Sequence, residues 1–165
     1  MTAENNGPLV IKAAEVADVP VLIGLIRELA EFENLLDEVK ADEETMRASL
    51  FGPGSTARAL LLYYNSTPAG YCIYFRNFST FLARPGLYVE DVYIRPQFRR
   101  LGLGRAVFGE LGKLAVEQGC GRLEFAVLDW NQAAIDFYQA LGAAPLSDWR
   151  LFRFSGPSLD RLAGR

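Results

Sequence analysis

The chain has 165 residues, 50% of them hydrophobic and 22% charged, which is enough apolar material for one folded domain and excludes a disordered chain. The net charge of −3 argues against a general nucleic-acid binder, and no apolar run approaches the roughly 18 residues of a membrane span. The sequence contains no histidine, which excludes a Ser-His-Asp triad, a Cys-His pair and a histidine-ligated metal site.

The N-terminal residues 1–8 are polar and are expected to form a flexible segment before a domain at 9–165. They lack the basic and apolar regions of a signal peptide. Cys72 and Cys120 are too few for a disulfide scaffold and are expected to be reduced thiols. These features predict a cytoplasmic protein.

The spacing of apolar residues predicts strands and helices that alternate along the chain. Asp18 and Asp42 are the expected N-caps of the first two helices, and the turn at 65–68 is expected to join two strands in a hairpin. In chain order, the predicted elements are a strand at 9–14, a helix from Asp18 to about Asn34, a helix at 43–51, strands at 58–64, 69–77 and 86–94, a helix at 104–118, a strand at 122–127, a helix at 132–141 and a strand at 150–154. This order is typical of a mixed α/β domain with a central sheet and helices on both faces.

Charge is concentrated in two places. The segment from Arg27 to Glu44 holds eight acids and two bases, a net charge of −6, whereas the segment from Arg95 to Arg105 holds four arginines and no acid. The pattern suggests two ligands of opposite charge. The alternative for most of the acids is a solvated helix face.

The basic segment contains the run Arg99-Arg100-Leu101-Gly102-Leu103-Gly104, between a predicted strand and a predicted helix. Glycines let the backbone approach a ligand, a helix N-terminus offers unpaired N–H groups, and arginines bind phosphate, so the run suits a pyrophosphate. It lacks the Gly-Lys-Ser/Thr of a Walker loop, and Val107 stands where a dinucleotide fingerprint needs Gly or Ala. The alternative is a glycine-rich turn with surface arginines.

This run, together with the preceding Val92 to Pro96, resembles the acetyl-CoA motif of the GNAT superfamily of N-acetyltransferases. The downstream runs Leu128 to Asn131 and Ile135 to Ala143 are similar to the diamine (spermidine/spermine) acetyltransferase branch, which includes the thialysine acetyltransferases. So are the runs from Glu28 to Glu33 and from Trp149 to Phe152. The resemblance covers most of the chain.

The resemblance implies a single-domain GNAT fold in which two neighbouring parallel strands, ending near Ile94 and Val127, splay apart. Acetyl-CoA would lie in the gap, its pantetheine arm on the backbone of one strand and its pyrophosphate on the N–H groups that open the following helix. The implied cofactor-binding residues are Val92, Tyr93, Ile94, Arg99, Arg100, Leu101, Gly102, Leu103, Gly104, Arg105 and Asn131.

The implied reaction is direct attack of an amine on the thioester carbonyl. A primary amine has a pKa near 10.4, so deprotonating it at pH 7 takes roughly 4.6 kcal/mol, a step that a carboxylate assists. The resemblance points to Tyr138 as the general acid for the leaving thiolate, the alternative being a core aromatic. It points to Glu90 as the base, directly or through water. The alternative base is Asp91, which otherwise makes a structural hydrogen bond; regular strand geometry would send the two to opposite faces.

Further residues are implied to bind the acceptor amine. Phe32 and Glu33 match amine-contacting positions of the branch, where the aromatic is usually tyrosine; the alternative is ordinary positions at a helix end. Glu90 and Asp91 would add negative charge, and Trp149 would either line the acceptor channel or fill the core. The run Leu146 to Asp148 departs from the acidic, glycine-containing run of the branch.

The sequence therefore predicts an N-acetyltransferase that uses acetyl-CoA and no metal to acetylate a small cationic amine, such as a polyamine or a lysine-like amino acid. The alternatives are a protein or peptide N-acetyltransferase and a non-catalytic acyl-CoA sensor. No nucleic-acid or membrane partner is expected. Family members are commonly homodimers, and a homodimer paired through residues 150–162 is expected here.

Overall fold

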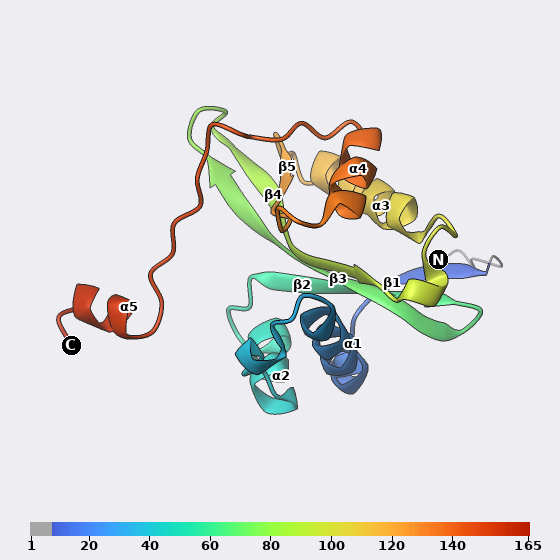
Figure 1. Cartoon of the computed structure of the whole chain (residues 1–165), viewed down its shortest axis with the longest axis horizontal. Coiled ribbons are helices and arrows are strands. Elements are labelled where there is room, and N and C mark those ends of the chain that lie inside the picture. The colour runs from blue at the N-terminus through green and yellow to red at the C-terminus, as the bar shows by residue number, and fades with distance from the viewer. Residues whose placement is uncertain (1–7) are drawn as a thin grey trace. The chain divides into compact units, whose positions relative to one another are not determined.

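The computed structural model describes residues 8–165, so the flexible segment predicted for 1–8 lies, apart from Pro8, outside the described residues (Figure 1). The described elements are β1 (Leu9–Ala13), η1 (Val16–Asp18), α1 (Val19–Phe32), η2 (Leu36–Glu38), α2 (Glu43–Phe51), β2 (Ala57–Tyr64), β3 (Thr67–Ser79), β4 (Arg84–Ile94), η3 (Pro96–Phe98), α3 (Leu103–Glu117), β5 (Leu123–Phe125), α4 (Gln132–Ala140) and α5 (Pro157–Leu162). The chain divides into two compact units, the first ending at Ala126 and the second comprising Val127–Arg165.

The first unit contains one mixed sheet in the order β1-β2-β3-β4-β5. Strands β1 to β4 pair antiparallel with one another, and β5 runs parallel to β4. The predicted hairpin is confirmed, with a tighter turn than expected because Tyr64 already pairs with Thr67. Asn65 and Ser66 have φ values of 46° and 61°, the left-handed pair that a two-residue hairpin turn needs to match the strand twist.

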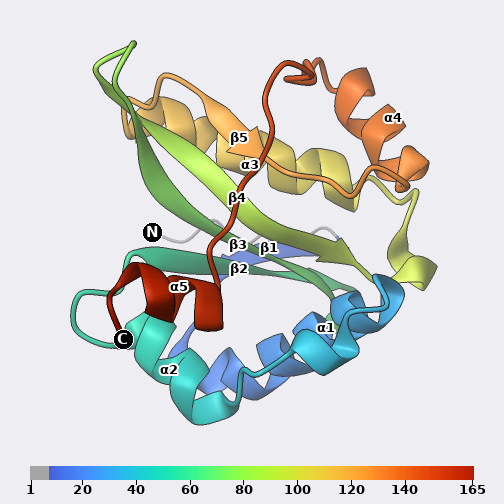
Figure 2. The ribbon, with the colours of Figure 1, turned by 60° about the vertical axis from the view of Figure 1, so that its left-hand side comes forward.

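Helices cover both faces of this sheet, as the element order predicted (Figures 1 and 2). On one face, Leu22 and Leu25 of α1 and Leu50 of α2 form a buried core cluster with side chains of β2, β3 and β4. On the other face, Val107 and Leu111 of α3 lie in a second cluster with other residues of the same strands. Each helix thus buries one apolar stripe. Alternate residues along the strands point to opposite faces of the sheet and pack in the two different core clusters.

The two predicted N-caps turn out differently. Asp42 caps α2 as expected: its Oδ1 accepts the Thr45 N–H at 2.8 Å, and the Thr45 hydroxyl accepts the Asp42 N–H at 3.1 Å. Asp18 stands at the N-cap of α1 without a side-chain cap bond. Its carboxylate instead binds Lys12 Nζ at 2.9 Å and the Glu15 N–H at 2.9 Å, which ties η1 to β1.

Two predictions for the C-terminal third need correction. The strand predicted at 150–154 is wrong: this segment has no strand structure. Its residues have the apolar character of a strand, but a strand forms only against a neighbour, and within the described residues no other strand follows β5. β5 itself spans three residues instead of the predicted 122–127, because its pairing with β4 stops at Phe125.

Candidate functional site

The arginine-glycine loop of the sequence connects β4 to α3 through the 3-10 turn η3. Gly102 is the N-cap of α3 and has φ 86°, a left-handed conformation that favours glycine. Arg100 also has a positive φ, 63°. The first α-type bond runs from the Ala106 N–H to the Gly102 carbonyl at 3.0 Å, so the N–H groups of residues 103–105 precede the helical ladder. The prediction that a helix follows the loop is confirmed.

Arg99 contacts the end of β4 and the end of α1. Its Nε donates to the Ile94 carbonyl at 3.0 Å, and its guanidinium carbon lies 5.0 Å from the centre of the Phe32 ring at the end of α1. The structure therefore brings together a residue predicted for the cofactor and one predicted for the acceptor. Such a cation–π contact is worth about 0.5–1 kcal/mol at an exposed site.

The C-terminal part of β4 has a strand neighbour on one side only, among the described residues. On the β3 side, Val92, Tyr93 and Ile94 pair with Cys72, Tyr71 and Gly70. On the β5 side, pairing covers Leu87 to Val89 and then ends. The parallel pairing thus ends at Val89, and β4 continues to Ile94 without a β5 partner.

A β-bulge marks the place where this separation begins. Ile73 of β3 pairs with Asp91, whereas the next residue, Tyr74, pairs with Val89, so Glu90 is the extra residue on β4. The bulge changes which face the strand presents: Val89 packs in the α3-side core, and Tyr93, four residues later, packs in the core beneath α1 and α2. Glu90 is exposed at the bulge, and Asp91 is partly buried. The regular alternation expected for these two carboxylates is therefore replaced by a bulge.

Burial dominates the electrostatics of Asp91. Burial is the largest cause that raises the pKa of this carboxyl, followed by the negative charges of Glu90 and Glu33, and the nearby Tyr71 hydroxyl acts in the opposite direction. Together these effects raise the pKa from 3.8 to about 6. Glu33 follows the last residue of α1, and burial raises its pKa as well. We call Glu33, Glu90 and Asp91 the acid group. The structure brings these three predicted residues together.

Other acids of the negative segment have structural partners. Glu28 receives three hydrogen bonds from Arg95, one from Nη2 at 2.6 Å and two from Nε at 2.9 Å and 3.1 Å, and the Tyr93 hydroxyl donates to it at 3.4 Å. The hydrogen bonds from Arg95 are the main reason that the pKa of Glu28 is lowered. Arg95 also donates to the Pro68 carbonyl at 2.7 Å, so the pair connects α1 to the end of β4 and to the start of β3. This ion pair was not predicted from the sequence, because 67 positions separate Glu28 from Arg95.

The second unit carries the remaining predicted residues. Asn131 is the N-cap of α4, and its Oδ1 accepts the Ala134 N–H at 3.3 Å. Tyr138 lies on α4, with its ring centre 5.4 Å from that of Phe137. Trp149 lies in the segment between α4 and α5. The functional roles of these three residues stay predictions.

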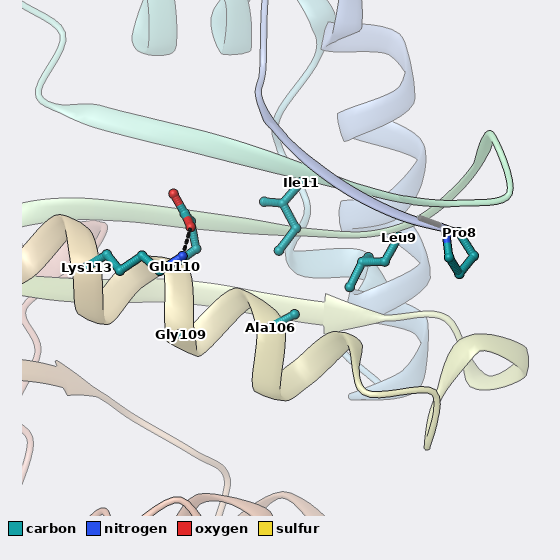
Figure 3. A pocket seen from close by; sticks show the side chains of 7 residues that line it. All are labelled: Pro8, Leu9, Ile11, Ala106, Gly109, Glu110 and Lys113. Atoms are coloured by element: carbon teal, nitrogen blue, oxygen red, sulfur yellow. Dashed lines mark hydrogen bonds and ion pairs between the residues drawn. The ribbon is translucent and has the colours of Figure 1, made fainter. Parts of the chain in front are cut away.

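The first unit also has a groove outside the predicted site. It lies between β1 and α3, has a volume of about 570 Å³, and contains an ion pair between Lys113 and Glu110 at 3.4 Å (Figure 3). Its lining residues are Pro8, Leu9, Ile11, Ala106, Gly109, Glu110 and Lys113. None of them is a predicted site residue. Within the part of the chain that the structure describes, no cluster of His, Cys, Asp and Glu fits a metal ion, and no helix has the length and apolar character to cross a membrane.

Comparison with known proteins matches residues 25–143 to the acetyltransferase (GNAT) family. A thialysine N-epsilon-acetyltransferase of Bos taurus is 38% identical over 168 residues, which cover 95% of this chain and 98% of the relative. An L-ornithine acetyltransferase of Arabidopsis thaliana is 29% identical, with 92% and 86% covered. Among solved structures, an integron cassette protein from the mobile metagenome of V. cholerae aligns with a TM-score of 0.81 at 22% identity, over 96% of this chain and 99% of that chain.

Proposed function

The chain belongs to the acetyltransferase (GNAT) family and is an N-acetyltransferase; we propose that it transfers the acetyl group of acetyl-CoA to a primary amine of a small cationic acceptor, a polyamine or a lysine-like amino acid. The observation that carries the proposal is a basic helix start that follows the strand carrying two members of the acid group. Glu90 and Asp91 lie on β4, and the loop follows directly. The similarity to enzymes named for thialysine and ornithine supports a cationic acceptor.

The residues of the loop fit acetyl-CoA. The N–H groups at the start of α3 and the side chains of Arg99, Arg100 and Arg105 would hold the pyrophosphate, because unpaired N–H groups and guanidinium groups both favour phosphate oxygens. The backbone of Val92 to Ile94, which lacks a β5 neighbour among the described residues, would receive the pantetheine arm. When bound, the cofactor supplies a thioester carbonyl for the amine to attack. Leu101, Gly102, Leu103, Gly104 and Asn131 complete the proposed cofactor set.

The acid group would hold the acceptor as a cation and remove its proton. Glu90, exposed at the bulge, is the proposed base, and Asp91 and Glu33 would hold the positive charge beside it. Because the pKa of Asp91 is about 6, the Asp91 carboxyl ionises and adds its negative charge to the acid group as the pH rises through 6. We expect the KM for the amine to fall over the same range. Phe32 would supply an apolar wall, and Trp149 would line the acceptor channel.

Tyr138 is the proposed general acid, which would donate its phenolic proton to the leaving thiolate. Replacing Tyr138 with Phe should reduce kcat at least tenfold, because such donors contribute about 10²–10⁴-fold, and should leave acetyl-CoA affinity unchanged. The control is Tyr63→Phe, on β2. An unchanged kcat in Tyr138→Phe would remove this residue from the mechanism.

The test of the function itself is thiol release from acetyl-CoA with spermidine, spermine, putrescine, thialysine, lysine, ornithine and a basic peptide as acceptors. We expect turnover confined to the small amines. Turnover with the peptide alone would favour a protein N-acetyltransferase. Acetyl-CoA binding without turnover of any acceptor would favour a non-catalytic sensor and overturn the proposal.

We further propose that the protein is a cytoplasmic homodimer that binds neither nucleic acid nor membrane. The dimer is proposed to pair through residues 150–162. Light scattering of the purified chain tests whether it is a dimer. Deletion of residues 150–165 tests whether this segment forms the dimer interface. A monomeric full chain would contradict the proposed assembly.

A further inference from the structure

Tyr71 lies on the same sheet face as the acid group. It pairs with Tyr93 across β3 and β4, and two residues further along β3, Ile73 pairs with Asp91. Residues two apart on a strand share a face, so Tyr71 and Asp91 are diagonal cross-strand neighbours. Tyr71, Ile73 and Tyr93 all belong to the core cluster beneath α1 and α2. The bulge at Glu90 puts Asp91 in this register.

The hydroxyl of Tyr71 is buried and lacks a partner at ordinary hydrogen-bond distance within the described residues. The whole residue is 0% exposed. A buried hydroxyl without a hydrogen bond is unfavourable, and phenylalanine would fill the same space without that penalty. The hydroxyl of Tyr93, directly opposite, has a partner in Glu28 at 3.4 Å. Of the two facing tyrosines, Tyr71 therefore has an unused donor inside the core.

The polar group that acts most strongly on this hydroxyl is the Asp91 carboxyl. Its negative charge and its hydrogen-bonding capacity raise the pKa of Tyr71, after the larger effect of burial. The titratable groups that interact electrostatically with Asp91 are Tyr71 and Cys72 on β3, Glu33 at the end of α1 and Glu90 on its own strand. Two of these carry negative charge and none is a cation. Tyr71 is thus the group in this set whose hydrogen bond favours the ionised form of Asp91.

We infer that Tyr71 is a positioning residue for Asp91: its buried hydroxyl donates a hydrogen bond to the carboxylate, keeps it ionised and fixes its orientation at the bulge. The donor is free for this role, because the Tyr71 hydroxyl has no other partner at hydrogen-bond distance within the described residues. The role in catalysis rests on the proposed function, since Asp91 is there one of the groups that hold the cationic acceptor. The contact itself is independent of what the acceptor is.

The experiment is a pH titration of Tyr71→Phe, with Tyr74→Phe as the matched control. Tyr74 is also a buried tyrosine of β3, but it belongs to the core cluster on the opposite face. In each protein, the ¹³C shift of the Asp91 carboxyl, assigned by its absence from Asp91→Asn, is followed from pH 4 to 9. We expect the Asp91 midpoint to rise by about half to one pH unit in Tyr71→Phe and to stay unchanged in Tyr74→Phe. The KM for the amine should shift along the pH axis by the same amount.

A second measurement needs no tyrosine variant. In the wild-type protein, the ¹³C shift of the Tyr71 ring carbon that bears the hydroxyl should titrate with the Asp91 midpoint, and this response should vanish in Asp91→Asn. An Asp91 midpoint that does not move in Tyr71→Phe, or that moves equally in Tyr74→Phe, would overturn the inference. Carboxyl shifts that behave as expected without any amine turnover would overturn the proposed function and leave the contact standing.

Discussion

The arginine-glycine loop and the acid group are built in opposite ways. The loop is contiguous: its glycine turn, its arginines and its free N–H groups all come from residues 99–105, at the start of one helix. The acid group combines the end of α1 with a bulge on β4, and its members are 57 positions apart between Glu33 and Glu90. The loop therefore depends on local backbone conformation, whereas the acid group depends on strand register and helix packing.

Their electrostatic settings differ in the same way. The loop arginines are mostly exposed, and their charge is solvated. Asp91 is desolvated and lies among like charges, which places an unfavourable charge inside the fold. A region that gathers like charges at the expense of stability is typical of a functional site. We therefore expect substitutions that remove charge from the acid group to lower activity and raise stability. Substitutions in the loop should mainly affect cofactor binding.

The largest effect is expected at Glu90. Glu90→Gln keeps the size and polarity of the side chain and removes the proposed base, so kcat/KM for the amine should fall by about 10²–10³-fold with acetyl-CoA affinity unchanged. Steady-state kinetics with both substrates varied provide the measurement. Glu44→Gln, on the exposed face of α2, is the control. If Asp91→Asn shows the larger loss in kcat instead, the base is Asp91, and Glu90 only binds the cation.

Asp91→Asn should stabilise the fold at neutral pH. The pKa of Asp91 is raised by folding, so the native state binds the proton more tightly than the unfolded chain, and stability falls as the pH rises from 3.8 through about 6. At about 1.36 kcal/mol per pKa unit, the penalty reaches at most about 3 kcal/mol above pH 7. Urea unfolding at several pH values should show a gain for Asp91→Asn at pH 7.5 that disappears near pH 4. A gain that does not depend on pH would contradict the assignment, and Asp37→Asn serves as the exposed control.

The arginine-glycine loop could be predicted from the sequence better than the acid group. The glycines and arginines of residues 99–104 carry their own geometry, and the helix start after Gly102 is where it was expected. The bulge at Glu90 was not expected, because it arises from the register of β3 against β4 and has no local signal. Long-range partners such as Glu28 and Arg95 were missed for the same reason. The strand predicted at 150–154 was wrong because apolar character alone does not provide a neighbouring strand.

A smaller effect is expected for the arginines of the loop. Arg100→Ala should raise the KM for acetyl-CoA about tenfold and change kcat little, because a charge-assisted hydrogen bond to phosphate is used equally before and during the reaction. The effect should weaken at high salt, as expected for an exposed charge. Arg76→Ala, on β3, is the control. A fall in kcat with an unchanged KM would mean that the loop arginine acts on the acetyl-transfer step.

The smallest effects are expected for two glycines of α3, Gly102 at its N-cap and Gly109 in its interior. Substituting each with alanine separates the effect of backbone conformation from that of packing. Gly102 and Gly109 both have open space where a Cβ would be, so neither substitution to alanine creates a clash. Gly102 has φ 86°, where an L-residue is strained by roughly 1–2 kcal/mol, whereas Gly109 lies inside α3, where alanine is favoured over glycine by about 1 kcal/mol. Gly102→Ala should therefore destabilise the protein in urea unfolding and raise the KM for acetyl-CoA, while Gly109→Ala should stabilise it and leave the KM unchanged. Equal effects of both substitutions would mean that the left-handed cap at Gly102 does not shape the loop, and the contrast between a locally encoded loop and an assembled acid group would fail.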